Sequence, residues 1–554
     1  MKVSDHVVDF FTTKGVEQVF CIAGGAAAHL LESVRKSNLN TIFNYNEQAC
    51  AMAADGYARI SKKPAIVLVT NGPGSTNTIT GVLGAWQDGI PVIIISGQVP
   101  RHQTMAAEPQ CLRQMGVQES DIITMVVKCT KYAKQIMDAR TLPIELEKAW
   151  RAATTGRMGP VWLDIPIDVQ AEQINNDIEV LISNASRPVI IAGNGIHLAN
   201  AEEQFINFTK KLKFPVVCNW NATDLFDWND PLYIGNPGLF GERAANLAIQ
   251  NADLILIIGT RMSIPCIGYD STKFAPSAIH IMVDIDENEI LKRTMNVDAY
   301  YYGDLRDFMK LDFGVSDVSA WVNVLNELKN ELSVFDEPHT RVDGRVNSYD
   351  LIQNLGSKLE PGDIVVTDMG TSFTCTMQAL RNTGANRLFT SSGLCSMGFG
   401  LPGAIGAWAS DPSRRVICIA GDGGIQMNIQ EFQTIIQHAI PLKIIVLNNG
   451  GYLAISLMQD NLFKNRFGSD VGSPNFSDLA RAYGIKVANS LGELLATPGP
   501  VLYEVSMVRD QLLIPRVASH RDPVTNQIRS GNLEAMFPFL SAERENDIKA
   551  RLSI

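Results

Sequence analysis

The sequence contains no apolar run close to the roughly 20 residues that a membrane-spanning helix needs, so we expect no contact with a membrane. The N-terminal stretch MKVSDHVVDF lacks the apolar region of a signal peptide. The 47 basic residues form no block and are outnumbered by 58 acidic residues, and this net charge of −11 argues against nucleic acid as a partner. These absences together predict a cytoplasmic protein.

Cysteine and histidine are present but show no ligand pattern. The nine cysteines include no C-x-x-C pair, and the eight histidines show no H-E-x-x-H spacing. We therefore expect reduced thiols rather than a disulfide framework or a zinc site. The hydrophobic content of 46% is typical of a globular protein with a sizeable core.

The 554 residues exceed what one core supports and suggest about three or four domains. Short apolar strands, such as Ala65–Thr70, Pro188–Ala192 and Val416–Ala420, alternate with helical lengths. This alternation predicts an α/β fold in which three domains each contain a parallel sheet covered by helices. The predicted domain limits are 1–172, 185–335 and 346–535, followed by a tail over 536–554.

The most informative motif lies in the third domain. Gly421-Asp422-Gly423 directly follows the strand Val416–Ala420, and Asn448-Asn449 follows a second strand after a gap of 24 residues, which is long enough for one crossover helix. Glycines let the backbone approach closely, and a carboxylate beside them can bind a divalent cation. The pattern predicts a phosphate-plus-magnesium site at the carboxyl edge of a parallel sheet. A βαβ unit with two polar turns is the alternative.

Three further segments carry polar or glycine-rich turns. Glu47 begins a helix that reads ACAMAADGYAR, where a carboxylate is favoured by the helix dipole. Thr70–Asn77 is a glycine-rich turn after a strand, and Gly393–Gly403 places Met397 among small residues. Asp368–Ser372 ends another strand, where N–H groups and hydroxyls can hold a diphosphate. Each also has a structural interpretation, namely helix capping, a common turn or core packing.

Taken together, these segments resemble the acetolactate synthase (acetohydroxyacid synthase) large-subunit-like branch of the thiamine diphosphate (ThDP) enzymes. The resemblance covers nearly the whole chain and implies a pyrimidine-binding domain, a central Rossmann-like domain and a domain that binds diphosphate and Mg²⁺. The matching segments, in chain order, are NEQACAMAADGYAR, NGPGSTN, GQVPR, QESDI, GRMGPVWLDIPIDVQ, SMGFGLPGAIGA, GDGG and LNN.

The resemblance implies a role for each candidate residue. Glu47 would be the catalytic acid: bonded to N1′ of the aminopyrimidine, it would favour the imino tautomer whose 4′ nitrogen takes the proton from C2. Gln118 would line the substrate pocket. Asp422, Asn449 and the Gly451 carbonyl would bind Mg²⁺. The remaining residues implied to contact ThDP are Pro73, Asn77, Cys395 and Met397 around the pyrimidine, Gly370, Thr371, Ser372, Gly423 and Gly424 around the diphosphate, and Tyr452.

The central domain has a Gly193-Asn194-Gly195 turn but no complete G-x-G-x-x-G fingerprint. The resemblance nevertheless implies FAD, which in flavin-containing members is largely structural for a non-redox reaction. A Rossmann-like scaffold that has lost its flavin is the alternative. The residues at the positions of the flavin contacts are Arg157, Gly193, Gly195, Thr260, Arg261, Asp284 and Asp304.

Two departures from the family bear on the acceptor substrate. Pro265 stands where the anabolic members carry an arginine for the acceptor carboxylate, and Met458 stands where they keep a tryptophan. Losing a charge-assisted carboxylate contact implies that the acceptor need not be a second 2-keto acid. The segment between GQVPR and Gln118 is also longer, which would change one wall of the pocket.

We therefore predict a ThDP-dependent enzyme that decarboxylates pyruvate and transfers the activated acetaldehyde (acetyl) unit to a carbonyl acceptor such as a keto sugar or aldehyde. The alternatives are an acetolactate synthase that joins two pyruvates and, less favoured, a pyruvate oxidase. A cofactor-binding protein without activity is disfavoured because Glu47, Asp422 and Asn449 are all present. The resemblance further implies a homodimer or homotetramer whose sites are shared between subunits.

Overall fold

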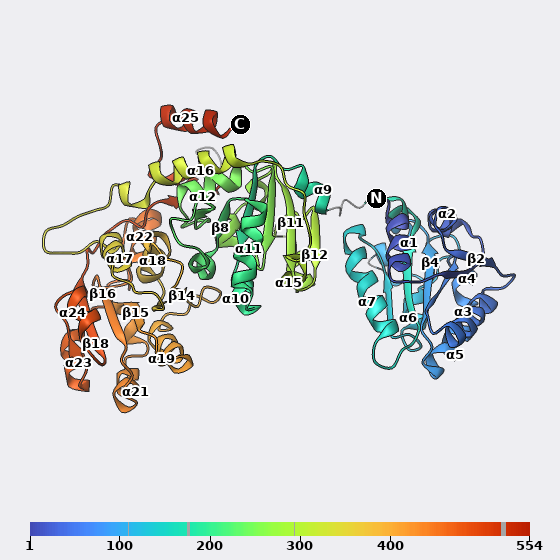
Figure 1. Cartoon of the computed structure of the whole chain (residues 1–554), viewed down its shortest axis with the longest axis horizontal. Coiled ribbons are helices and arrows are strands. Elements are labelled where there is room, and N and C mark those ends of the chain that lie inside the picture. The colour runs from blue at the N-terminus through green and yellow to red at the C-terminus, as the bar shows by residue number, and fades with distance from the viewer. Residues whose placement is uncertain (109, 174–177, 293, 522–527, 554) are drawn as a thin grey trace. The chain divides into compact units, whose positions relative to one another are not determined.

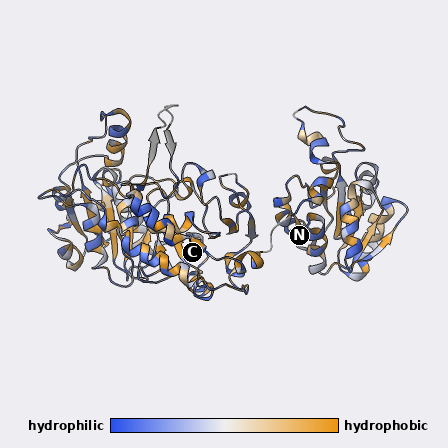
Figure 2. Ribbon diagram, turned by 90° about the horizontal axis from the view of Figure 1, so that it is seen from above, coloured by the Kyte–Doolittle hydropathy of each residue, from blue (hydrophilic) through white to orange (hydrophobic). Residues whose placement is uncertain are grey.

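The computed structural model describes residues 1–108, 110–173, 178–292, 294–521 and 528–553 (Figure 1). These residues form three six-stranded sheets in which every strand pair is parallel, with helices between successive strands. The helices show alternating hydrophilic and hydrophobic bands in Figure 2, as expected where one face packs on a sheet and the other contacts solvent. The predicted α/β fold with parallel, helix-covered sheets is confirmed.

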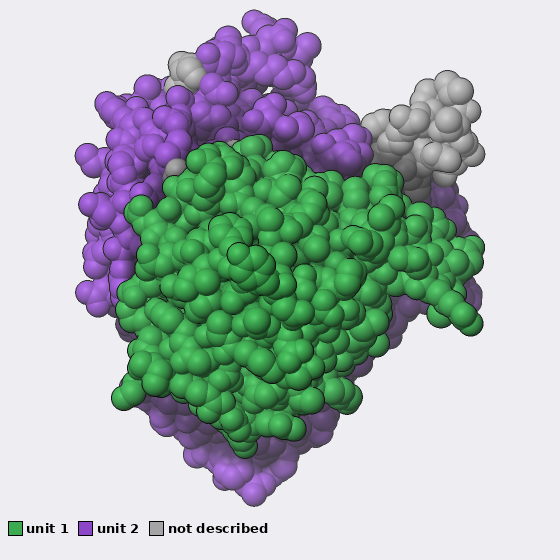
Figure 3. All heavy atoms as spheres, turned by 90° about the vertical axis from the view of Figure 1, so that its right-hand side faces the viewer, with its two compact units in different colours: residues 1–176 green, residues 177–554 purple. Residues whose placement is uncertain are grey.

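The chain divides into two compact units, residues 1–176 and 177–554, which Figure 3 colours separately. The first sheet belongs to the first unit, and the other two sheets belong to the second unit. The three predicted domain limits therefore stay a prediction. None of the described helices is long and apolar enough to cross a membrane.

The first unit contains a sheet with the strand order β2-β1-β3-β4-β6-β5. Two apolar clusters cover its faces, because alternate residues of a strand point to opposite sides. Ile66 and Leu68 pack with α1, α2 and α7, whereas Val67 and Val69 pack with α3 and α5. The elements are β1 (Gln18–Cys21), β2 (Asn40–Phe43), β3 (Ala65–Val69), β4 (Val92–Gln98), β5 (Tyr132–Gln135), β6 (Val161–Pro166), α1 (Val3–Thr13), α2 (Ala28–Lys36), α3 (Glu47–Ser61), α4 (Pro73–Thr76), α5 (Ile79–Asp88), α6 (Ile122–Val126), α7 (Leu142–Thr154) and α8 (Ile167–Ala171).

The second unit begins with a sheet of order β12-β11-β10-β7-β8-β9. Its central strands are fully buried apolar runs, as expected for a parallel sheet covered on both faces. The elements used below are β7 (Pro188–Ala192), β8 (Val216–Cys218), β9 (Tyr233–Gly235), β10 (Leu254–Ile258), β11 (Ile279–Asp284), β12 (Ala299–Tyr302), α10 (Gly195–Leu198), α11 (Glu202–Leu212), α12 (Arg243–Gln250), α13 (Ile264–Ile267) and α16 (Ser319–Glu331).

The last sheet has the order β14-β13-β15-β16-β18-β17. Val365 and Ile417 pack with α17, α18 and α24 on one face, and Val366 and Cys418 pack with α19, α21 and α23 on the other. The elements are β13 (Ile364–Thr367), β14 (Arg387–Phe389), β15 (Val416–Gly421), β16 (Lys443–Asn448), β17 (Lys486–Val487), β18 (Val501–Ser506), α17 (Ser348–Gly356), α18 (Thr371–Ala379), α19 (Gly400–Ser410), α20 (Asp422–Gln426), α21 (Glu431–Gln437), α22 (Leu453–Phe463), α23 (Phe476–Tyr483) and α24 (Leu491–Ala496).

The C-terminal residues return to the central sheet region. β19 (Arg516–Val517) pairs with β22 (Met536–Phe537), and Val517 N–H donates to the Leu239 carbonyl at 2.8 Å. The buried Arg243 of α12 forms an ion pair with Glu337 at 2.6 Å and donates to the Met536 carbonyl at 3.2 Å. The final helix, α25 (Ala542–Leu552), is joined to α16 by ion pairs from its arginines. The tail is thus fastened by polar contacts to the second unit.

A buried carboxylate lies inside the first sheet. Asp164 of β6 is 1% exposed and accepts hydrogen bonds from Ser96 Oγ (2.5 Å), Gln98 Nε2 (3.1 Å) and Gln135 Nε2 (3.0 Å). Burial raises the pKa of Asp164 from 3.8 to about 6, because the hydrogen bonds only partly replace the water that the charged form loses. The folded chain therefore binds this proton more tightly than the unfolded chain does.

We expect this carboxylate to make the first unit less stable as the pH rises from about 4 to about 6. Below that window both states hold the proton, and above it the folded state keeps a buried charge at a cost of up to ~3 kcal/mol. Asp164→Asn should raise the urea midpoint at pH 7.5 relative to the original chain and reduce the fall in that midpoint between pH 4 and pH 7.5.

Glu108→Gln, at an exposed position of the same unit, is the control and should leave the pH dependence unchanged. An Asp164→Asn chain with the original pH dependence would show that Asp164 does not titrate in this range.

Candidate active site

The carboxyl edge of the last sheet brings three predicted turns together. β13 pairs with β14 on one side and with β15 on the other. The chain therefore adds strands toward one edge of the sheet up to β14 and toward the other edge from β15 on. In open parallel sheets such a switch point leaves a crevice outside the carboxyl ends of the strands. The turns after β13, β15 and β16 begin at Asp368, Asp422 and Asn449. They therefore lie at neighbouring positions of one edge.

Asp422 is the best-connected residue of this edge. Its side chain is 2% exposed, and Oδ1 accepts from Gly423 N–H at 2.9 Å. Oδ2 accepts from Gly450 N–H (2.7 Å), Gly451 N–H (3.0 Å) and Ser473 Oγ (2.7 Å). A buried carboxylate needs such partners, and here they come from the turn after β16 and from the segment before α23. The carboxylate thus joins three separate stretches of chain.

Asn449 lies beside this carboxylate. Gly451 N–H points to both Asp422 Oδ2 (3.0 Å) and Asn449 Oδ1 (3.2 Å), so the two oxygens converge on one point. Oxygen atoms from a carboxylate and an amide are ligands that Mg²⁺ prefers. Among the described residues no group of three or more His, Cys, Asp or Glu could hold a metal, so any cation here would use amide or carbonyl oxygens. The residues present fit that description.

Glycines allow other groups to pack closely on the start of α20. A Cβ at Gly423 would lie 2.2 Å from Tyr452 Cε1, and a Cβ at Gly424 would lie 2.5 Å from Asp368 Oδ1. The Tyr452 ring therefore packs directly on the Gly423 backbone, and the turn tolerates no side chain at either position. Such a bare backbone at a helix start exposes N–H groups that can bind phosphate oxygens.

Asp368 begins the predicted Asp368–Ser372 segment, but the sequence assigned no role to its carboxylate. It is 0% exposed, and its carboxylate accepts from Met369 N–H (2.8 Å), Gly398 N–H (3.0 Å) and Gly400 N–H (2.8 Å). It therefore joins the end of β13 to the loop that carries Met397. An acidic residue directly after a buried strand was the available signal, but its partners lie about 30 residues away in sequence and cannot be identified from a local pattern.

The residues predicted around the cofactor occupy this edge in two groups. Gly370, with φ of +77°, precedes α18, and Thr371 and Ser372 form the first turn of that helix, with Ser372 Oγ donating to the Met369 carbonyl at 3.0 Å. Cys395 adopts a left-handed conformation with φ of +59°, and Met397 is 40% exposed. A methionine exposed to this degree beside a buried carboxylate is available for contact with a ligand.

Glu47 and Asn77 meet in the first unit. Glu47 is the first residue of α3, half-buried, and its Oε2 accepts from Asn77 Nδ2 at 3.0 Å. The N-cap Asn46 accepts from Gln48 N–H at 2.8 Å, which fixes the helix start. Pro73 is the first residue of α4 in the same turn as Asn77. The structure thus joins the Glu47 helix and the Thr70–Asn77 turn, as the two predicted roles require.

Gln118 lies on a long loop that a buried carboxylate holds in place. Glu119 is 7% exposed, and its side chain accepts from Met105 N–H (2.5 Å), Met115 N–H (3.0 Å) and Gly116 N–H (2.9 Å). Gln118 itself is exposed and adopts a left-handed φ of +57°.

The same loop is braced against the turn after β3. Asn71 Nδ2 donates to the Val117 carbonyl at 2.9 Å, and a Cβ at Gly72 would lie 2.3 Å from the Gln118 carbonyl oxygen. The turn therefore carries a glycine where the loop backbone approaches, and Gln118 is held close to Pro73 and Asn77.

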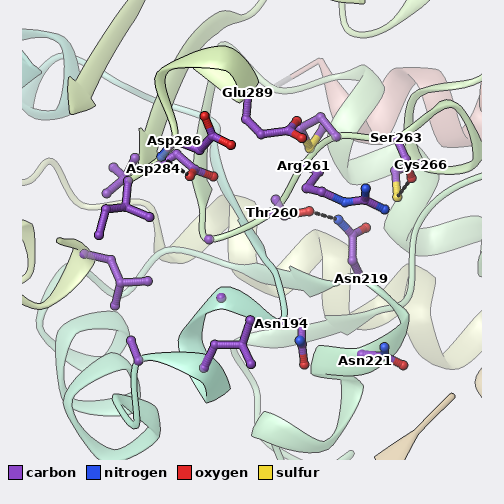
Figure 4. A pocket seen from close by; sticks show the side chains of 18 of the residues that line it. Asn194, Asn219, Asn221, Thr260, Arg261, Ser263, Cys266, Asp284, Asp286 and Glu289 are labelled. Atoms are coloured by element: carbon purple, nitrogen blue, oxygen red, sulfur yellow. Dashed lines mark hydrogen bonds between the residues drawn. The ribbon is translucent and has the colours of Figure 1, made fainter. Parts of the chain in front are cut away.

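A second candidate site is a cavity of about 580 Å³ beside the central sheet. β7 pairs with β8 and β10, so the cavity lies at the switch point of this sheet. Gly195, Thr260, Arg261, Asp284 and Asp304 line it. In Figure 4 the acidic side chains Asp284, Asp286 and Glu289 gather at one end, and Asn194 and Asn221 lie at the other.

Glycines again allow a close approach at this switch point. A Cβ at Gly193 would lie 2.3 Å from the Gly259 carbonyl oxygen, and Gly195 N–H donates to that same oxygen at 2.8 Å. Thr260 Oγ1 accepts from Asn219 Nδ2 at 2.6 Å (Figure 4). Glycine turns and a carboxylate at a strand end are features of dinucleotide sites, so the residues fit such a ligand.

The carboxylates of this cavity differ in environment. Burial raises the pKa of Asp284, whereas hydrogen bonds from Arg306 lower the pKa of Asp304 to about 2. Asp304 is therefore ionised at neutral pH. Arg157 belongs to the first unit, where its guanidinium donates to the Gln87 carbonyl at 3.0 Å.

Comparisons with known proteins agree with this arrangement. Three domain models of thiamine pyrophosphate (TPP) enzymes match the chain: the N-terminal TPP binding domain matches residues 1–125, the central domain matches 176–311, and the C-terminal TPP binding domain matches 368–502. TPP is another name for ThDP. These three matches cover the turns that carry Glu47, the central cavity and Asp422.

Several curated relatives align over almost the whole chain. The acetolactate synthase isozyme 2 large subunit of Escherichia coli (strain K12) is 30% identical over 94% of this chain and 99% of its own length. The probable acetolactate synthase large subunit of Methanocaldococcus jannaschii is 33% identical over 88% and 87%. The acetolactate synthase large subunit of Lactococcus lactis subsp. lactis (strain IL1403) is 29% identical over 93% and 94%. The chain therefore belongs to the thiamine pyrophosphate enzymes, in the family of the acetolactate synthase large subunits.

Proposed function

We propose that this chain is a ThDP-dependent carboligase that decarboxylates pyruvate and joins the resulting two-carbon unit to a second pyruvate, giving acetolactate. The convergence of Asp422 and Asn449 oxygens beside a glycine-lined helix start is the observation that carries the cofactor assignment. The matches to two TPP binding domains support the same cofactor. When bound, ThDP supplies an electron sink for the carbanion left by decarboxylation.

The protein's part in the chemistry begins with holding the cofactor. Asp422, Asn449 and the Gly451 carbonyl would bind Mg²⁺ and with it the diphosphate. The backbone of Gly423 and Gly424, together with Thr371 and Ser372 at the start of α18, would surround the diphosphate oxygens. Asp368 would act indirectly, because its three hydrogen bonds position the loop that presents Met397 and Cys395.

Glu47 would act on the aminopyrimidine ring of ThDP. Its carboxylate would bind N1′ of the aminopyrimidine and so support the acid–base chemistry that ThDP would supply. Asn77 donates to Glu47 Oε2, which leaves Oε1 for the cofactor and fixes the direction of the carboxylate. Pro73 would contact the pyrimidine ring from the same turn.

Glu47 lies in the first unit and Asp422 in the second, so the proposal requires the two to meet. We propose that they do so between subunits of a homodimer or homotetramer. FAD is proposed for the cavity at the central switch point, with Asp284, Arg261 and Thr260 among its contacts. Gln118 would line the pyruvate pocket.

The identity of the acceptor rests on two opposing observations. The relatives that align over the whole chain are named acetolactate synthases, and this favours pyruvate as the acceptor over a keto sugar or an aldehyde. Pro265 of α13 and Met458 of α22 favour a keto sugar or an aldehyde as the acceptor, because neither side chain can pair with an acceptor carboxylate. Pyruvate is the better supported acceptor.

Glu47→Gln should reduce turnover of pyruvate by at least about 100-fold while leaving ThDP bound, because the amide keeps the shape of the side chain but not its charge. Turnover and ThDP binding by calorimetry are measured on the same preparation. Glu17→Gln, which removes an exposed carboxylate of the same unit, should retain activity. Full activity of Glu47→Gln would remove Glu47 from the mechanism.

Asp422→Asn should weaken the binding of Mg²⁺ about tenfold or more, since a neutral amide is a poorer ligand and its N–H₂ group would face the N–H donors of Gly450 or Gly451. The measurement is the Mg²⁺ concentration needed for half-maximal ThDP binding. Asp312→Asn changes the same charge at a side chain that is 87% exposed and serves as the control. An unchanged Mg²⁺ requirement would contradict the metal assignment.

Pyruvate supplied alone should yield acetolactate, identified by mass spectrometry. Product that forms only after an aldehyde or keto sugar is added would identify that compound class as the acceptor instead. Oxygen consumption with peroxide release would instead identify an oxidase. In each case Glu47→Gln provides the inactive control.

A further inference from the structure

A cavity beside the turn after β16 (Asn449–Gly451) is lined mostly by side chains to which the proposed reaction gives no role, with Asn449 as the residue shared with the proposed Mg²⁺ site. Its volume is about 650 Å³, and its walls come from the ends of β16 and β18, the segment that leads into α23, and the linker before α17. The positively charged side chains of the lining are Arg345, Arg481 and Arg509. None of the residues predicted to surround the diphosphate belongs to this lining.

The arginines are only partly engaged. The Arg509 guanidinium makes no hydrogen bond or ion pair with any described residue, and Arg345 donates through Nη1 to the Met507 carbonyl at 3.0 Å. Arg481 pairs with Asp478 at 2.7 Å, but both side chains are exposed. Solvent-exposed pairs of this kind are weak and exchange readily with other anions.

Glu504 is the one carboxylate among the described lining residues, and its oxygens are already occupied. Oε1 accepts from Asn448 Nδ2 at 2.8 Å, and Oε2 accepts from Ser477 N–H and Ser477 Oγ, both at 2.9 Å. Glu504 thereby satisfies the start of α23 rather than an arginine. The lining carries three positive side chains and one negative side chain, and Asp478 pairs with Arg481, so one positive charge remains in excess.

The backbone permits a guanidinium to reach the metal turn. Gly450 has φ of +80°, and a Cβ there would lie 2.9 Å from Arg509 Nη2. A side chain at position 450 would therefore displace the Arg509 guanidinium. The Arg509 guanidinium therefore lies against the Gly450 backbone, and its N–H groups, which point outward in its plane, can bind an oxyanion in bidentate fashion.

We propose that this cavity is a binding site for a phosphate group, carried either by inorganic phosphate or by a small phosphomonoester. The tetrahedral oxygens of a phosphate can accept from the Arg345 and Arg509 guanidinium groups at once, and neither of these groups forms an ion pair with a described residue. The cavity shares Gly450 and Ser473 with the hydrogen bonds to Asp422 Oδ2. A ligand in it therefore lies against the turn that positions the metal-binding oxygens.

The test uses the full chain loaded with ThDP and Mg²⁺, so that the diphosphate site is filled. Inorganic phosphate and glycerol 3-phosphate are titrated separately by calorimetry, with chloride keeping the ionic strength constant. Saturable binding of at least one probe in the millimolar range or tighter is expected. Tighter binding of glycerol 3-phosphate would identify a phosphomonoester as the ligand, and equal or weaker binding would identify free phosphate.

The variants assign the site. Arg345→Gln combined with Arg509→Gln should lower the affinity about tenfold or more, and Arg481→Gln alone should lower it by a smaller factor. Arg341→Gln removes the same charge from an exposed arginine near Arg345 that pairs with Asp350 and is outside the lining, so it should leave the affinity within about twofold.

Two results would overturn the proposal: the absence of saturable binding of both probes, or binding that the double variant leaves unchanged. Because binding is measured without turnover, either failure is distinguishable from a failure of the proposed carboligase reaction.

Discussion

The hydrogen bonds to the buried Asp422 carboxylate are the constraint on which the rest of the last sheet's edge depends. The carboxylate draws in N–H groups from the turn after β16 and a hydroxyl from Ser473, which is 51 residues away in sequence. A buried charge without these donors would be strongly unfavourable, so the turn must close around it. Closing the turn also brings Asn449 into place. The oxygens that would bind a cation are therefore positioned by hydrogen bonds within the protein.

Buried carboxylates also hold other loops in place. Asp368 holds the segment around Met397, and Glu119 holds the loop that carries Gln118, each through three backbone N–H donors. Loops that must present a side chain cannot rely on sheet or helix bonds, because their backbone groups are otherwise free. A buried carboxylate supplies several acceptor positions at one point and so gives an irregular segment one conformation.

The three sheets also share one topological feature. In each, the first strand pairs with the next strand of the chain on one side and with a later strand on the other, as β1 does with β2 and β3, β7 with β8 and β10, and β13 with β14 and β15. A crevice forms where the order reverses. The Thr70–Asn77 turn, the central cavity and the Asp368–Asp422 edge each border such a reversal. The same reversal of strand order therefore accounts for the placement of all three predicted binding regions.

The sequence by itself determined the alternation of apolar strands and helices, and hence the parallel α/β sheets, because burial on both faces requires runs such as Ala65–Val69 and Val416–Ala420. It also marked Asp422, Asn449 and Glu47, since a strand end or a helix start is a local feature. Only the tertiary structure decided which distant groups meet these residues. Asp368 with Gly398, Glu119 with Met105, and the arginines at 345, 481 and 509 are neighbours through strand order and loop path. Neither of these is encoded in a local pattern, because each depends on how the whole chain packs.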